Sequence, residues 1–392
     1  MSPDRFDDIR PYYDSEISDA MKRIAGSELF PLISSYVFPG RDMEEVRDLI
    51  CKITTIDQFQ HEVMSVVNEQ VIKRSMTKFT YGGLDRLNAD KRYLFVSNHR
   101  DIMLDSSLLQ YLLHINGHET SEITFGANLM CHPLVIDIGK SNKMFKVERG
   151  GTLMDFYRSS LHLSDYIRYA ITEKKQSVWI AQRNGRTKDG NDHTEPGLIS
   201  MFASSYPADK VRALDELHIV PVSISYEWET CDILKTLELY ESRITCYVKK
   251  PGEDLNSILT GIVTDKGHVH IEICEPVRLE ELQSLDSLTK QEYVRSVAKL
   301  IDKRINAAYH LHANNYIAFD LRYGTDRYSD KYTPSQKEEF LERLKELIRY
   351  ESYELETLSD ILLGIYANPI NSRTSAISPV SYTHLRAHET RH

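Results

Sequence analysis

RYLFVSNHRDIMLDSSLLQYLL, residues 92–113, joins a short apolar run to a second apolar run through a polar segment. The first run has the length and the aromatic and aliphatic composition of a buried strand. The second run has apolar residues at three- and four-residue spacing, which predicts a helix. The polar segment NHRD (residues 98–101) therefore lies where a strand ends and a helix begins.

Further runs with the composition of strands occur at residues 78–83, 121–129, 177–182, 218–226 and 268–277. Helical patterns separate several of them, at residues 105–115, 151–174 and 195–206. Short strands that alternate with helices are typical of an α/β domain with buried, mainly parallel strands. We therefore predict an α/β fold, with an αβ domain at residues 77–282.

Helical segments are predicted on both sides of this domain, at residues 1–76 and 283–378. The first segment has helical spacing at residues 16–30, 42–53 and 56–74. In the second, Thr333, Pro334 and Gln336 form the start signal of a helix over 334–349. Residues 379–392 resemble the in-frame translation of a transposase adapter used in sequencing libraries, so we exclude them from the fold; a disordered tail is the alternative.

The composition is that of a globular protein of 392 residues, with 41% hydrophobic and 27% charged residues. The longest apolar stretch, residues 29–38, is too short to span a bilayer, and we expect a core segment there rather than a membrane-docking one. Five scattered cysteines and an N-terminus without a signal-peptide pattern predict a cytoplasmic protein, with peripheral contact at the inner face of the membrane. A net charge of −10 argues against nucleic acid as a partner.

His99 is the first candidate for catalysis because it follows a predicted strand and precedes two aspartates. A histidine held by a carboxylate is the arrangement of a general base. Asp101 can cap the following helix, and Asp105, one turn further along, can point back toward His99. A second pair, His132 and Asp137, encloses a proline and apolar residues, so we predict a packed turn there.

A basic stretch lies at residues 140–188, where eleven lysines and arginines stand against four acidic residues. Two of its clusters are FKVERGG (residues 145–151) and AQRNGRTKDG (residues 181–190). Glycines let a ligand approach the backbone, and arginine matches phosphate oxygens with two parallel hydrogen bonds. The stretch predicts a phosphorylated substrate, with a basic surface that binds nothing as the alternative.

Four segments in order carry a family resemblance: NHRDIMLD (98–105), FKVERGG (145–151), QRNGRTKDG (182–190) and IVPVSISYEW (219–228). They resemble the four characteristic blocks of the glycerolipid acyltransferases, the glycerol-3-phosphate and 1-acylglycerol-3-phosphate acyltransferase superfamily. The resemblance implies an αβ domain with a mixed sheet, in which a histidine and an aspartate face basic residues across one cleft.

By this resemblance His99 would be the general base and Asp105 its partner. The acceptor would be bound by Arg149, Gly185, Arg186, Lys188 and, in the fourth block, Pro221. The implied reaction moves a fatty acyl group from acyl-CoA or acyl carrier protein to a hydroxyl of glycerol 3-phosphate or 1-acylglycerol 3-phosphate. The acyl donor is a co-substrate, and no further cofactor and no metal are expected.

Two features depart from the family pattern. Five residues separate His99 from Asp105 where the family usually has four, which leaves Asp101 as an alternative partner. Asn184 stands where the third block usually carries a glutamate, which removes a charge. Acyl transfer to another amphiphile, such as an amino-acid lipid, and a non-catalytic relative that binds a lipid or a carrier therefore stay open as hypotheses.

His268 and His270 point to one face of the predicted strand 268–277 and could chelate a metal. The sequence shows no third ligand beside them. We therefore expect ordinary surface or core histidines at these two positions.

Overall fold

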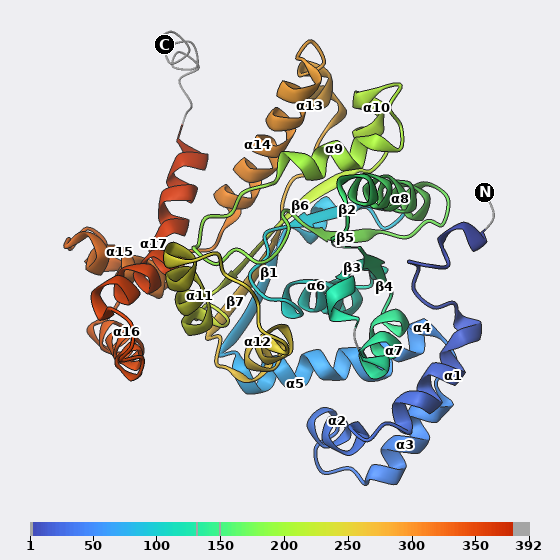
Figure 1. The fold of residues 1–392 in the computed structure, drawn as a ribbon, viewed down its shortest axis with the longest axis horizontal. Coiled ribbons are helices and arrows are strands. Elements are labelled where there is room, and N and C mark those ends of the chain that lie inside the picture. Colours follow the sequence, from blue (N-terminus) through green and yellow to red (C-terminus); the bar gives the residue numbers. More distant parts are fainter. Residues whose placement is uncertain (1–2, 131, 149, 379–392) are drawn as a thin grey trace.

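A computed structural model describes residues 3–130, 132–148 and 150–378. Its centre is a seven-stranded sheet with the strand order β1-β7-β6-β2-β5-β3-β4 (Figure 1). The strands are β1 Lys78–Gly82, β2 Leu94–Ser97, β3 Glu122–Gly126, β4 Met144–Val147, β5 Val178–Ala181, β6 Ile219–Tyr226 and β7 His268–Ile273. The sequence predicted a run for each of these strands except β4, so the strand pattern of the domain is largely confirmed.

Neighbouring strands in the sheet are parallel, with one exception: β6 and β7 are antiparallel. The predicted α/β fold with a mixed sheet, flanked by helices, is therefore confirmed. β2 lies between β6 and β5, and all four of its residues are buried. A strand covered on both faces needs an apolar run without alternation, which is what LFV provides.

β4 is the strand that the sequence pattern did not predict. It is four residues long, it pairs with β3 at the edge of the sheet, and Lys146 interrupts its apolar character. A strand of this length carries too few apolar residues to be distinguished from a loop in a basic stretch.

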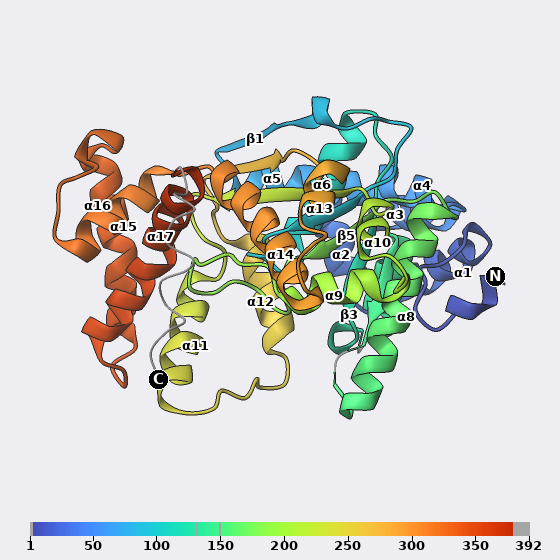
Figure 2. The same cartoon turned by 90° about the horizontal axis from the view of Figure 1, so that it is seen from above.

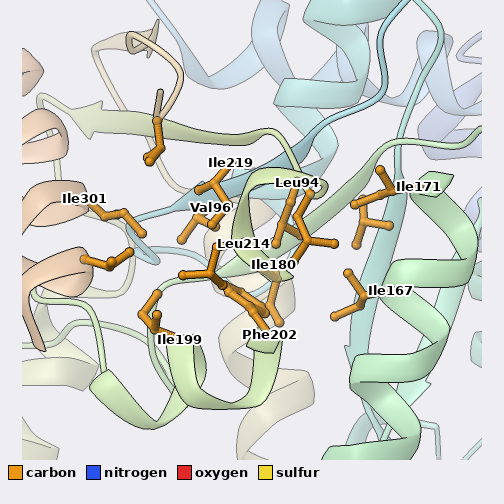
Figure 3. Packing of buried hydrophobic residues seen from close by; sticks show 14 of the residues in the cluster. Leu94, Val96, Ile167, Ile171, Ile180, Ile199, Phe202, Leu214, Ile219 and Ile301 are labelled. Carbon is orange, nitrogen blue, oxygen red and sulfur yellow. The ribbon is translucent and has the colours of Figure 1, made fainter. Parts of the chain in front are cut away.

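The two faces of the sheet are covered by different helices because side chains alternate along a strand. Leu94 and Val96 pack on one side with α8 Leu153–Thr172, α9 Pro196–Ser204 and α14 Lys290–Ala308. Figure 3 shows these two side chains among Ile167, Ile199 and Ile301. Phe95 belongs to the opposite cluster, which includes residues of α5 Ser65–Ser75 and α6 Leu104–Ile115.

Helices precede and follow the sheet at opposite ends of the molecule (Figure 2). The preceding helices are α1 Asp14–Ala25, α2 Phe30–Val37, α3 Met43–Lys52 and α4 Ile56–Phe59, followed by a π-helical turn and α5. They form a core of their own, in which Phe30 and Val37 of the apolar run 29–38 are buried.

The helices between and after the later strands complete the chain: α7 Pro133–Ser141, α10 Lys210–Asp215, α11 Asp232–Ile244, α12 Glu253–Val263, α13 Leu279–Ser284, α15 Ala313–Tyr323, α16 Pro334–Lys345 and α17 Leu355–Ile377. At the start of α16, Thr333 and Gln336 make the predicted capping box. Within the described residues, no helix combines the length and the apolar character that a membrane span requires.

Candidate active site

His99 lies at the carboxyl end of β2, in the loop that leads into α6. Its Nδ1 is 2.9 Å from Oδ2 of Asp105, and both side chains are buried. The ring also meets the indole of Trp179 edge to face, with centroids 6.0 Å apart. Because the carboxylate engages Nδ1, Nε2 is the nitrogen left to exchange a proton with a substrate.

Asp105 is the partner of His99 although the spacing differs from the family pattern. It stands in the first turn of α6, and its Oδ2 also accepts hydrogen bonds from the backbone N–H groups of Arg100 and Asp101, at 2.6 and 2.9 Å. Its Oδ1 accepts from the Tyr226 hydroxyl at 2.7 Å. Because these donors surround the carboxylate, the loop between β2 and α6 folds around Asp105. The loop therefore accommodates the additional residue between His99 and Asp105, and the two side chains still meet.

Asp101, the alternative partner, has a different role. Its Oδ1 accepts from the backbone N–H groups of Met103 and Leu104, both at 2.9 Å, so it caps the start of α6 as predicted. Its Oδ2 is buried and has no hydrogen-bond partner among the described residues. Gly261 of α12 packs against this oxygen, and a Cβ at that position would lie 2.3 Å from it.

The side chain of Arg100 connects the loop between β2 and α6 to the segments that carry Asp192 and Glu229. The side chain is fully buried; it donates to Oδ2 of Asp192 at 2.6 Å and to Oε2 of Glu229 at 3.2 Å. Burial alone would lower the pKa of Arg100, but Asp192, Tyr309 and Glu229 raise it well above the ordinary value. The guanidinium is therefore a permanent charge inside the protein, balanced by two carboxylates.

The segment that follows β5 places Gly185 and Arg186 at the carboxyl end of the strands, the end of the sheet where His99 also lies. The backbone N–H of Thr187 donates to the carbonyl of His99 at 2.6 Å, which joins this segment to the histidine loop. Gly185 has φ +77°, a conformation that favours glycine, and a Cβ there would meet open space. Arg186 is buried; its Nη2 donates to Ser257 of α12 at 3.2 Å, while its Nη1 has no partner among the described residues.

The remaining predicted site residues are placed differently. Lys188 is ion-paired with Glu238 of α11, so its charge is already balanced. Pro221 lies within β6, opposite Val96 of β2, and its carbonyl accepts from the Cys274 N–H at 2.9 Å. It is thus a buried residue of the sheet and not a loop residue at the site. Arg149 lies outside the described residues.

The second histidine–aspartate pair is not a pair in the structure. His132 caps α7, with its Nδ1 accepting from the Leu134 N–H at 3.2 Å. Asp137 accepts instead from the Tyr12 hydroxyl at 2.7 Å and from Arg23. His132 therefore stabilises the start of α7, and Asp137 stabilises the contact between α7 and the N-terminal segment, in line with the structural role expected for them.

Residues 78–225 match the family model described as Acyltransferase. This part of the chain is similar to that family. Among solved structures, the 1-acyl-sn-glycerophosphate acyltransferase PlsC from Thermotoga maritima is similar to 72% of this chain and 92% of that one, with 15% identity and a TM-score of 0.35. No curated protein matches the chain. The family resemblance of the four sequence blocks is supported by the match over residues 78–225.

The basic stretch at residues 140–188 is not a single basic surface. Arg168 pairs with Glu216, Lys174 with Glu122, Lys146 with Glu148 and Lys188 with Glu238. Each of these four cations is therefore balanced by a carboxylate, and three of the four carboxylates are distant in sequence. The basic stretch supplies fewer uncompensated charges than its count of lysines and arginines suggests.

A cavity of about 1140 Å³ lies between α8, α9 and the ends of β3 and β5. Its walls include apolar side chains such as Ile180, Leu198 and Met201. Lys146, Arg158 and Arg183 also line it, and so does Asn184. His99 does not line the cavity, which reaches the segment 181–184 that immediately precedes Gly185 and Arg186.

Sequence reasoning missed three residues that shape the site. The backbone N–H of Arg100 and the hydroxyl of Tyr226 both donate to Asp105, the partner of His99. Trp179 packs against the His99 ring. Arg100 and Tyr226 lie within the first and fourth blocks. A charged or polar residue in a block that is otherwise buried was the feature of the sequence that could have identified them. Trp179 lies in an apolar strand and gave no such signal.

Proposed function

We propose that this protein transfers a fatty acyl group from a thioester, acyl-CoA or acyl carrier protein, to a hydroxyl of glycerol 3-phosphate or 1-acylglycerol 3-phosphate. His99 Nε2 takes the proton of the acceptor hydroxyl as its oxygen attacks the thioester carbonyl. The carbon–sulfur bond then breaks, and the thiol leaves with a proton returned by the imidazolium. Asp105 holds the imidazole tautomer and stabilises its charged form.

The observation that carries the proposal is the buried contact between His99 and Asp105 at the carboxyl end of β2, within the residues that match the acyltransferase family. A carboxylate that accepts four hydrogen bonds cannot easily rotate away, so the imidazole is held in one orientation before substrate binds. This arrangement supports a catalytic protein over a relative that only binds a lipid or a carrier.

Arg186 is proposed to bind the acceptor phosphate, because its Nη1 is buried and has no hydrogen-bond partner in the part of the chain that the structure describes. An unpartnered guanidinium nitrogen is costly unless a ligand supplies the acceptor. Arg186→Ala is expected to raise the KM for the acceptor by about 10–100-fold, as for loss of a charge-assisted hydrogen bond, with a smaller change in kcat.

Initial rates over a series of acceptor concentrations would measure this effect, with the exposed Arg327→Ala as the matched control. An acceptor KM that stays at the wild-type value in Arg186→Ala would remove Arg186 from the phosphate site.

The cavity is proposed to hold the acyl chain of the donor, because its walls include apolar side chains such as Ile180, Leu198 and Met201. Ser200 of α9 lines it. Ser200→Trp fills part of the space, so we expect the preferred acyl chain to become shorter by several carbons, since each buried CH₂ contributes about 0.8 kcal/mol.

Competition between acyl donors of different chain length would show the shift, and Ser329→Trp, at an exposed position, is the control. An unchanged chain-length profile in Ser200→Trp would place the acyl chain elsewhere.

One assay tests the proposed function as a whole. Purified protein is given labelled glycerol 3-phosphate or 1-acylglycerol 3-phosphate, each with acyl-CoA and with acyl carrier protein. Product with either acceptor supports the proposal and identifies the donor. Product only with another hydroxyl or amine amphiphile, such as an amino-acid lipid, would contradict the acceptor, and donor binding without any product would favour the non-catalytic relative.

A further inference from the structure

Four histidines gather on the face of the sheet opposite to α6. His268 and His270 come from β7, and His310 and His312 from the segment between α14 and α15. Ring centroids are 5.0 Å apart for His268 and His310, 5.0 Å for His268 and His312, and 4.7 Å for His310 and His312. The third and fourth imidazoles, absent near residue 268 in the sequence, are supplied by the fold.

Three of these side chains can meet at one point. His268, His310 and His312 each offer one ring nitrogen, and the three nitrogens lie within 4.8 Å of one another. Three nitrogens around a tetrahedral Zn²⁺, each about 2.0–2.1 Å from the metal, lie somewhat closer than that. Small side-chain rotations therefore suffice to bring the three nitrogens onto one ion. His310 is exposed, which leaves the site open to an ion and to a fourth ligand from solvent.

Hydroxyl groups contact the rings from outside the cluster. Thr80 Oγ1 lies 2.6 Å from Nε2 of His268, and Ser225 Oγ lies 3.2 Å from Nε2 of His312. In protein metal sites, the imidazole nitrogen that does not bind the metal usually contacts a hydrogen-bonding partner, which fixes the ring orientation. Two of the three candidate ligands already have such a partner.

We propose that His268, His310 and His312 form a binding site for a first-row transition metal ion of the Zn²⁺ type. Three imidazoles without carboxylates or thiolates suit zinc, nickel, cobalt or copper and disfavour calcium and magnesium, which prefer oxygen ligands. The site is separate from the proposed acyl transfer, since His99 lies on the other side of the sheet with Trp179 and α6.

Such an ion would fasten β7 to the segment that leads into the C-terminal helices. The same segment carries Tyr309, whose ring lies 5.3 Å from the guanidinium carbon of Arg100. The metal would therefore stabilise a segment that also contacts Arg100, in the loop that carries His99. This stabilising role predicts a higher Tm for the metal-loaded protein.

The test measures binding of Zn²⁺ and Co²⁺ to the full chain. His384, His388 and His392 are replaced by alanine in every sample, because three histidines in residues 379–392 could bind the same ions. We expect one Zn²⁺ per chain to survive dialysis against metal-free buffer, Co²⁺ to give visible absorption bands of a nitrogen-ligand site, and Tm to rise with either metal. Mg²⁺ should produce none of these changes.

His310→Ala is the main variant, because its exposed side chain can be removed with little risk to folding. It should weaken Zn²⁺ binding by at least about 10–100-fold and abolish the metal-dependent rise in Tm. His61→Ala is the matched control, since His61 lies beside His114 with ring centroids 5.3 Å apart, a pair that offers two ligands only. Failure of the parent chain to retain Zn²⁺, or equal retention by His310→Ala, would overturn the proposal, whatever the acyltransferase activity.

Discussion

His99→Ala is expected to lower kcat for acyl transfer by about 10²–10⁴-fold, which is the usual contribution of a general base. The reason is the position of the imidazole: Asp105 binds Nδ1 at 2.9 Å, so Nε2 alone serves the acceptor hydroxyl. Alanine leaves Asp105 with its bonds to the Arg100 and Asp101 N–H groups and to Tyr226. The loop should therefore keep its shape, and substrate binding should change little.

Steady-state rates with saturating donor and acceptor would measure this effect, and donor binding by calorimetry would show that the site is intact. His118→Ala is the control, because His118 lies after the carboxyl end of α6, away from the site. A His99→Ala protein that retains more than about a tenth of the wild-type kcat would show that another group takes the proton.

Arg100→Met is expected to reduce the free energy of unfolding by about 3–5 kcal/mol, since removing one partner of a buried ion pair leaves uncompensated charge behind. Asp192 would lose its guanidinium partner, and Glu229 would keep only Lys235 of its two cations. The methionine side chain fills similar space, so the loss would come from charge and not from a cavity.

Urea unfolding followed by circular dichroism measures this free energy. Arg212→Met removes a surface ion pair with Glu216 and should unfold at the wild-type urea concentration within experimental error. If Arg100→Met does not fold, the double variant with Asp192→Asn should restore folding, because Glu229 keeps Lys235 as its partner and no buried charge is then left without one. A loss below about 1 kcal/mol in Arg100→Met would mean that solvent reaches the two carboxylates.

The histidine pair was predictable because its geometry is local. β2 ends at Ser97 and α6 begins at Leu104, so the residues between them must form one short turn in which Asp101 caps the helix and Asp105 faces back. Strand and helix periodicity was sufficient for this inference. The choice between Asp101 and Asp105 depended on the path of the backbone, which spacing alone does not define.

The proposed phosphate site was less predictable because charge counts along a chain ignore partners that are distant in sequence. Lys188 belongs to the predicted basic cluster, but Glu238, fifty positions further on, lies against it in the fold. Arg186, two residues earlier, remains buried with an unpartnered nitrogen. Residue type identified both as candidates, and only packing distinguishes the available cation from the neutralised one.

The class of fold, the family blocks and the turn that carries His99 follow from local pattern, because hydrophobic periodicity and helix capping act over a few residues. The buried ion network of Arg100 and the meeting of His268 with His310 and His312 join segments that are 40 to 130 positions apart. Tertiary structure alone decided these, since side chains so distant in sequence become neighbours only when the sheet and its helices pack together.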